Sequence, residues 1–166
     1  MHTNLDSAPG GVNDVLLKAL GAEPGGVLAD AKESEIGSYG LGRYGTLSEE
    51  TALRAFLAQV KTALNANGLR YHDAGRPVLK LAVCGGSGGE FLEDAAALGC
   101  DTYLTADVKY DRFLTAKALG VNLIDAGHFS TENPVVPVLA DTLREAFPTL
   151  DVRVAESHRQ TEQFFV

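Results

Sequence analysis

From residue 78 onward the chain alternates short apolar runs with helix-length segments, and this alternation is the strongest constraint on its fold. The links between the runs are short. Strands and helices in regular succession favour parallel pairing, so we expect an α/β fold with a mostly parallel sheet and flanking helices. The predicted strands cover residues 78–84, 102–105, 121–126 and 152–154, and the predicted helices cover residues 91–98, 110–119 and 133–147.

Polar residues follow the ends of three successive predicted strands. A glycine loop, residues 85–89, follows the first strand, Asp107 and Lys109 follow the second, and His128 and Glu132 follow the third. Sites in open parallel sheets form beyond the carboxyl ends of the strands. We therefore expect these three segments to meet at one edge of the sheet.

Two histidine–carboxylate pairs, each with a spacing of four residues, are the candidate metal ligands. His128 and Glu132 stand between a predicted strand and a predicted helix, and His2 and Asp6 open the chain. Imidazole and carboxylate groups are common ligands of zinc, manganese and iron. Each pair taken alone also fits an ordinary surface or capping role.

The other two histidines are interpreted as loop residues. His72 lies in a polar stretch between Tyr71 and Asp73. His158 follows Ser157, but adjacent residues rarely face each other as a nucleophile and its base, and no orienting acid is evident.

Two interpretations of the glycine loop are open. A glycine-rich link between a strand and a helix presents N–H groups that bind phosphate or carboxylate, which would make Gly86, Ser87 and Gly88 binding residues. The alternative is a tight turn, in which glycine avoids collision with a neighbouring strand or ligand-bearing loop. The loop matches neither the dinucleotide fingerprint nor a Walker loop.

The part before residue 78 has a less regular pattern. Glycines flank Arg43 within residues 38–46, so this segment is either a flexible connection or an ordered loop that presents Arg43 to an anion. We further expect a helix over residues 12–20, a brief strand over residues 25–30, a second helix from the N-cap Ser48 to about Gly68, and a loop over residues 69–77.

Composition excludes several classes of partner. The 166 residues carry a formal net charge of −8, which disfavours nucleic-acid phosphates and anionic membranes as main partners. No apolar stretch reaches the length of a membrane span and no signal-peptide pattern opens the chain, so we expect a cytoplasmic protein. Cys84 and Cys100 are expected to be small buried residues without a disulfide.

Five motifs occur in a recognisable order along nearly the whole chain. They are His2-Thr3-Asn4-Leu5-Asp6, Gly40-Leu41-Gly42-Arg43, Cys84-Gly85-Gly86-Ser87-Gly88, Thr105-Ala106-Asp107-Val108-Lys109-Tyr110, and Asp125-Ala126-Gly127-His128 with Glu132. In these motifs the chain resembles the GTP cyclohydrolase 1 type 2 homologues, also called Nif-three-like dinuclear metal proteins.

The resemblance implies a Nif-three-like fold and a site for two divalent ions, zinc, manganese or iron. By resemblance, Asp6 binds one ion, His128 binds the other, and Glu132 bridges both. His2 is expected to be a ligand or a nearby group that orients Asp6.

The resemblance also implies that the segment with Thr105, Asp107 and Lys109 lines the substrate side of the metal cleft. Two positions depart from the family pattern. Asp111 stands where family members have a histidine, and Ala106 stands where they have a glycine. If the family histidine transfers protons, this chain has lost or altered that step.

Family members carry a preceding segment with a His-His-Pro motif that supplies two more ligands, and they form ring-like hexamers. Nothing in this sequence matches that motif, so we expect an N-terminally truncated chain. Residues 1–77 would be the remainder of an N-terminal α/β part with a connecting helix, and residues 78–166 the C-terminal part with the metal motif. A homo-oligomer is expected.

The predicted function is metal-dependent hydrolysis of a nucleotide or another phosphorylated small molecule by a metal-activated water. Glu132, Asp107 and Lys109 are the predicted catalytic residues. The alternatives are a non-catalytic metal-binding regulator or scaffold, and an inactive fragment with an incomplete dinuclear site.

Overall fold

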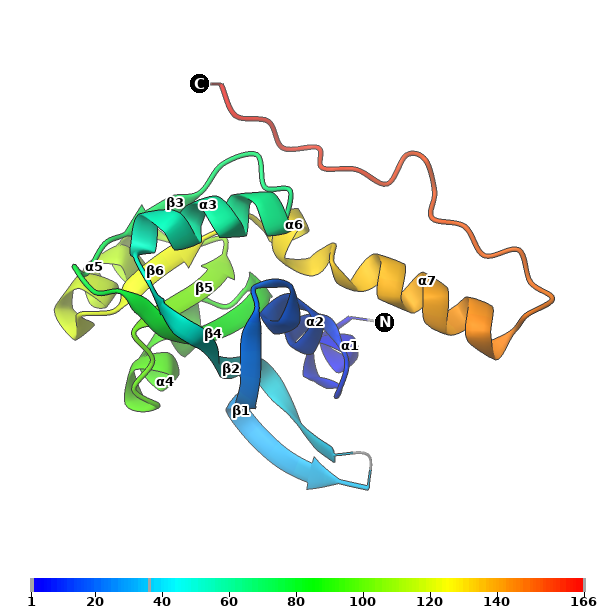
Figure 1. Ribbon diagram of the computed structural model, residues 1–166, viewed down its shortest axis with the longest axis horizontal. Coiled ribbons are helices and arrows are strands. Elements are labelled where there is room, and N and C mark those ends of the chain that lie inside the picture. The colour runs from blue at the N-terminus through cyan, green and yellow to red at the C-terminus, as the bar shows by residue number, and fades with distance from the viewer. Residues whose placement is uncertain (1, 36, 166) are drawn as a thin grey trace.

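A six-stranded sheet organises the molecule (Figure 1). The computed structural model describes residues 2–35 and 37–165, and within them the strand order is β1-β2-β4-β5-β6-β3. The strands are β1 (Ala22–Ser34), β2 (Gly37–Thr51), β3 (Arg70–His72), β4 (Val78–Ser87), β5 (Thr102–Ala106) and β6 (Asn122–Asp125). The helices are α1 (Thr3–Ser7), α2 (Val12–Ala19), α3 (Leu53–Ala63), the 3-10 helix η1 (Gly89–Phe91), α4 (Leu92–Ala97), α5 (Tyr110–Leu119), α6 (His128–Glu132) and α7 (Val135–Ala146).

The sheet is mixed. Strands β4, β5 and β6 are parallel, with Val83 opposite Leu104 and Leu104 opposite Ile124. The pairings of β1 with β2, β2 with β4 and β3 with β6 are antiparallel. The predicted α/β class with flanking helices is confirmed, and parallel pairing holds for the half from residue 78. The sheet as a whole is not mostly parallel, because β1, β2 and β3 add antiparallel pairs.

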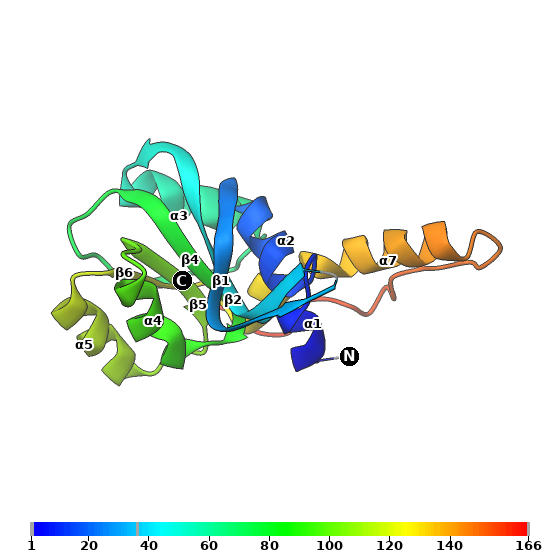
Figure 2. The ribbon, with the colours of Figure 1, turned by 90° about the horizontal axis from the view of Figure 1, so that it is seen from below.

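Helices cover both faces of the sheet (Figure 2). Val83, Leu104 and Ile124 point to the face packed by α2 and α3, whereas Cys84 and Tyr103 point to the face packed by α4 and α5. Alternation of side chains along each strand produces this division. Both cysteines are buried and free, as predicted. Strands from residues 1–77 and 78–166 share the one sheet, and the division at residue 77 stays a prediction.

The segment expected to be a flexible connection or an anion-presenting loop is instead part of β2. Together with β1 it forms a long hairpin that extends beyond the sheet (Figure 1). Glycine is required where the two strands approach closely, since a Cβ added at Gly40 would lie 2.6 Å from the carbonyl oxygen of Ala29. Strand pairing therefore overrides the loop character that the glycines indicate.

Three other predicted features are wrong. The expected loop over residues 69–77 contains β3, which pairs with β6. Ser48 does not cap a helix, because β2 continues to Thr51 along β4 and α3 begins only at Leu53. Residues 152–154 form no strand and lie in an irregular tail beyond α7 (Figure 1). The carbonyl of Val152 accepts hydrogen bonds from the Arg144 side chain instead of from a neighbouring strand.

Candidate metal centre

His128 and Glu132 are the first and last residues of α6, a short helix directly after β6. Gly127 makes the turn into it with a φ of 82°. Residues four apart on a helix lie on the same face, and Nε2 of His128 is 3.2 Å from Oε1 of Glu132. The predicted helix begins only at residue 133, whereas α6 begins at His128, and this earlier helical turn places both side chains on one face.

Asp107 holds the other nitrogen of the His128 ring. It follows β5 with a φ of 52°, and its Oδ2 lies 2.6 Å from Nδ1 of His128. This hydrogen bond is the main reason that the pKa of His128 is raised, with the Glu132 carboxylate acting in the same direction. The contact fixes the ring with Nε2 toward Glu132, the arrangement common for histidines that bind metals.

The glycine loop packs directly beneath this pair. A Cβ added at Gly86 would lie 2.5 Å from Oε1 of Glu132 and 3.1 Å from Nε2 of His128. Gly86 also has a φ of +66°, which glycine adopts readily. Residue 86 must therefore be glycine for α6 to approach the end of β4.

Two N–H groups at the start of the loop donate within the protein. Gly86 donates to Oγ1 of Thr131 at 3.0 Å, and Gly85 donates to Oδ1 of Asn13 at 2.8 Å. A Cβ at Gly88 would lie 2.7 Å from Sγ of Cys84. These contacts favour the tight-turn interpretation over an anion cradle, although Ser87 is exposed at the cavity wall.

Thr105 does not face the cleft directly. Its side chain is fully buried, and its hydroxyl donates to the carbonyl of Gly86 at 3.1 Å. It therefore stabilises the glycine loop from below.

Asn13 positions Asp6 beside the loop, a role that the sequence did not reveal. Its buried side-chain amide donates to the carbonyl of Asp6 at 2.9 Å while its oxygen accepts from Gly85. The sequence signal for this role is Asn13 itself, a polar residue beside the apolar positions of the predicted helix over residues 12–20.

A cavity of about 240 Å³ joins the predicted ligands. His2, Asp6, His128 and Glu132 all line it, together with Ser87, Cys84 and Glu90 from the β4 end. Burial raises the pKa of Asp6, while the nearby imidazoles of His2 and His128 oppose that rise. Among the described residues the His2 ring makes no hydrogen bond to the Asp6 carboxylate, since Nδ1 of the ring pairs with the Thr3 hydroxyl at 3.2 Å, so the ring lies near that carboxylate without orienting it directly.

The donor set fits a divalent ion without enclosing it. Two ligands of one tetrahedral zinc ion are about 3.3–3.6 Å apart, given bonds of about 2.0–2.2 Å, and the His128–Glu132 separation of 3.2 Å lies just below that range. Among residues 2–35 and 37–165, no three His, Cys, Asp or Glu side chains converge into a preformed cluster. Asp6 lies on the same cavity wall and is the nearest candidate for a third ligand.

A polar pocket of about 240 Å³ adjoins the centre through Ser87, Glu90 and Asp107. Lys109, Asp111 and Arg112 complete its wall. Arg112 contacts Glu93 at 3.0 Å and Asp111 at 3.5 Å, so its charge is largely compensated. Lys109 makes no ion pair among the described residues and is the cation available to a ligand there.

Arg43 is a structural residue. Its guanidinium is 4% exposed and contacts the Asp14 carboxylate at 2.7 Å and 3.2 Å. Four carbonyls accept its remaining N–H groups, those of Ser7, Ala8, Gly40 and Gly42. The predicted anion is thus a carboxylate of the protein itself.

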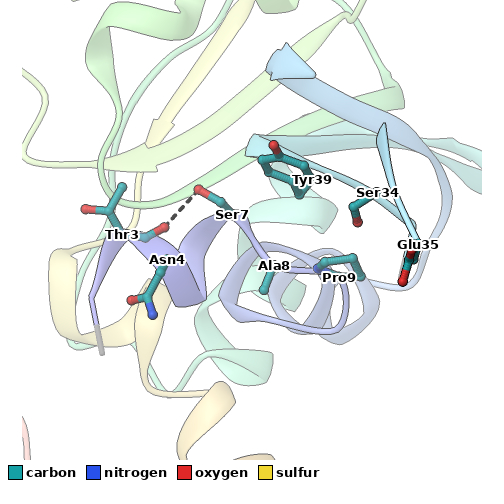
Figure 3. Close-up of a pocket in the computed structure, with 8 residues that line it drawn as sticks. All are labelled: Thr3, Asn4, Ser7, Ala8, Pro9, Ser34, Glu35 and Tyr39. Atoms are coloured by element: carbon teal, nitrogen blue, oxygen red, sulfur yellow. Dashed lines mark hydrogen bonds between the residues drawn. The ribbon is translucent and has the colours of Figure 1, made fainter. Parts of the chain in front are cut away.

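A larger cavity lies away from these groups. It measures about 700 Å³ and separates α1 from the hairpin tip, where Tyr39 lies across from Ala8 and Pro9 (Figure 3). Glu35 is the one acidic side chain in its lining, and the lining holds no histidine or cysteine. Size alone therefore does not locate the chemistry.

No helix within the described residues combines the length and apolar character needed to cross a membrane.

Comparison with known proteins agrees with this arrangement. The family model Duf34/NIF3 (NGG1p interacting factor 3) matches residues 1–163. A GTP cyclohydrolase 1 type 2 homolog of Clostridium perfringens is 34% identical over 164 residues, which cover 98% of this chain and 62% of that protein. The chain thus spans less than two thirds of this relative.

Solved structures show the same fold. A Bacillus cereus protein related to NIF3 superposes with a TM-score of 0.85 at 23% identity, over 99% of this chain and 72% of the other. A hypothetical protein of Staphylococcus aureus gives a TM-score of 0.83 at 25% identity, over 99% and 67%. With the model match running through every motif of the centre, the chain belongs to the Duf34/NIF3 family.

Proposed function

We propose that the chain binds divalent metal through His128, Glu132 and Asp6 and hydrolyses a nucleotide or another phosphorylated small molecule. The observation that carries this proposal is the orientation of the His128 ring, in which Nδ1 contacts the Asp107 carboxylate while Nε2 faces Glu132. Histidines that bind metals almost always have their second nitrogen held in this way. Names given to relatives, GTP cyclohydrolase 1 type 2 homolog, support a nucleotide as substrate.

Each side chain has a separate task in this proposal. His128, Glu132 and Asp6 would hold zinc, manganese or iron, which would supply a water of lowered pKa and so hydroxide near neutral pH. Asp107 fixes the imidazole of His128, and Glu132 presents its carboxylate on the same helix face. Lys109 supplies a positive charge for a phosphate in the adjoining pocket, where charge-assisted hydrogen bonds are strong.

The test is metal content and turnover in parallel. Wild-type protein, Glu132→Ala and the control Glu145→Ala, an exposed carboxylate on α7, are purified without chelator and analysed for metal. Each is then given a panel of nucleotides with and without added Zn²⁺ or Mn²⁺. We expect metal-dependent product release from wild type and control and none from Glu132→Ala. Equal metal content in all three proteins would reject the assigned ligands.

A non-catalytic metal-binding regulator is the second candidate. It is favoured by the absence of a preformed three-donor cluster among the described residues and by Asp111 in the place of the family histidine. Its signature is metal binding that depends on Glu132 with no turnover of any nucleotide.

We also propose a cytoplasmic homo-oligomer with a small-molecule substrate. Helix α7 projects from the sheet (Figure 1), and Leu143, Phe147 and Leu150 at its end are 46%, 52% and 58% exposed. Apolar side chains exposed together commonly mark an interface. Light scattering tests this proposal, and a mass equal to one chain would contradict it.

A further inference from the structure

A second cavity, of about 250 Å³, shares the carboxylates of the metal centre. His2, Asp6 and Glu132 line both cavities. The rest of the second wall is mostly apolar and comes from α1, α2 and the start of α7, with Leu5, Val12, Val135, Val136 and Leu139. A ligand that fills this cavity would therefore pack its apolar part against these side chains and hold its reactive bond beside Asp6 and Glu132.

The rings of Phe129 and His158, together called the aromatic corner, form part of the wall of this cavity. The ring of Phe129, on α6, lies 5.2 Å from the ring of His158 at an interplanar angle of 42°. His158 belongs to the irregular C-terminal tail, and its Nε2 lies 2.8 Å from Oδ1 of Asn133. A tilted ring–ring contact and a hydrogen bond thus hold one residue of an otherwise irregular segment at the cavity wall.

The corner also offers polar groups. Oδ1 of Asn133 only accepts, so its contact with Nε2 of His158 suits the tautomer with the proton on Nε2, in which Nδ1 is an acceptor. The side-chain N–H groups of Asn133 make no hydrogen bond among the described residues. The wall thus combines aromatic faces with one acceptor and a donor, which is the complement of a heteroaromatic ring with polar edges.

We propose that this second cavity binds the heteroaromatic ring of the substrate, with Phe129 and His158 as binding residues. The inference rests on the proposed function and narrows its substrate class to phosphates that carry a base, in preference to sugar phosphates. Ligand pockets usually measure about 300–1,000 Å³, so a cavity just below this range suits one ring system and leaves the phosphate in the pocket of Lys109.

The test uses ligands without a phosphate and a chelator, so that it does not depend on the metal. Calorimetry with EDTA measures adenosine, guanosine and ribose 5-phosphate binding to wild type, His158→Ala, Phe129→Leu and the control His72→Ala. His72 lies on β3 and does not line this cavity. We expect both corner variants to weaken nucleoside binding at least about 5-fold, because stacking of one base contributes about 1–3 kcal/mol.

Ribose 5-phosphate affinity should be the same in all four proteins. The proposed ring-binding site is overturned if wild type binds no nucleoside. It is also overturned if His158→Ala and His72→Ala bind nucleoside with equal affinity. The hydrolase proposal fails separately: nucleoside binding that depends on His158 without any metal-dependent turnover would keep the ring site and reject hydrolysis.

Discussion

Two groups of polar residues differ in burial and in how far the protein satisfies their hydrogen bonds. They are the Arg43 cluster, with Asp14, and the His128 cluster, with Glu132 and Asp107. Arg43 is buried, and each of its nitrogens contacts Asp14 or a backbone carbonyl. The side chains of His128 and Glu132 are 48% and 36% exposed, and Nε2 faces only another ligand-type atom. Polar groups that the protein satisfies internally contribute stability, whereas those held in place but left open are available to a ligand.

The largest predicted effect is on the buried cluster. Arg43→Met leaves Asp14, which is 28% exposed, without its cation and removes the arginine N–H donors of four carbonyls, so the free energy of unfolding should fall by about 3 kcal/mol. Urea titration measures the change. Arg153→Met is the control, since Arg153 forms an exposed pair worth about 1 kcal/mol or less. Equal losses in the two variants would contradict the comparison.

Gly86→Ala should damage both stability and the site. Backbone strain at positive φ costs about 1–2 kcal/mol, and the added Cβ collides with the Glu132 carboxylate. Gly75→Ala is a matched control, because Gly75 has a φ of +73° and no atom lies within 4 Å of its added Cβ. We expect similar strain in both variants, with an additional loss of about 1 kcal/mol or more and of metal affinity only at residue 86.

Asp107→Asn should lower metal affinity with little effect on the free energy of unfolding. Asparagine tolerates the positive φ as aspartate does, but it no longer holds Nδ1–H of His128 with a charge. Metal affinity should fall about 10–100-fold, while unfolding free energy changes by about 0.5 kcal/mol or less. Asp111→Asn, on the exposed start of α5, is the control for removal of a nearby charge. Unchanged Zn²⁺ affinity in calorimetry would show that Asp107 does not support a ligand.

The smallest effect is expected at the thiols. Burial raises the pKa of Cys84 to about 12 and that of Cys100 to about 11, so almost no thiolate exists at pH 8. Labelling of native protein by a disulfide reagent should be slow and should rise with pH, although Cys84 lines the metal cavity. Rapid labelling of native protein at pH 8 would show that this wall is open.

Much of the fold follows from local patterns. The helix over residues 110–119 has its predicted bounds, and its C-cap Gly120 adopts the left-handed conformation that the sequence indicates. Failures concentrate where partners are distant in sequence. The β1–β2 hairpin and the late start of α3 depend on pairing with β4, which lies beyond them in the chain.

The candidate site shows the same division. The spacing of His128 and Glu132 identified the pair, and strand ends predicted that the glycine loop would meet it. Asn13 was missed because its partners, Asp6 and Gly85, lie in segments that only folding brings together. For Ser87 and Gly88 the sequence left open an anion site and a tight turn, and the packing around the loop favours the turn.

The sequence by itself determined the α/β class, the three strand ends that carry polar residues, and the identities of the ligand-type side chains. Tertiary structure decided which polar residues became internal. Arg43 and Asp14 are 29 residues apart and neutralise each other in the core, whereas His128 and Asp107, 21 residues apart, meet at an exposed edge. Local patterns fix elements because their contacts are close in sequence, but solvent access depends on every segment packed around a side chain.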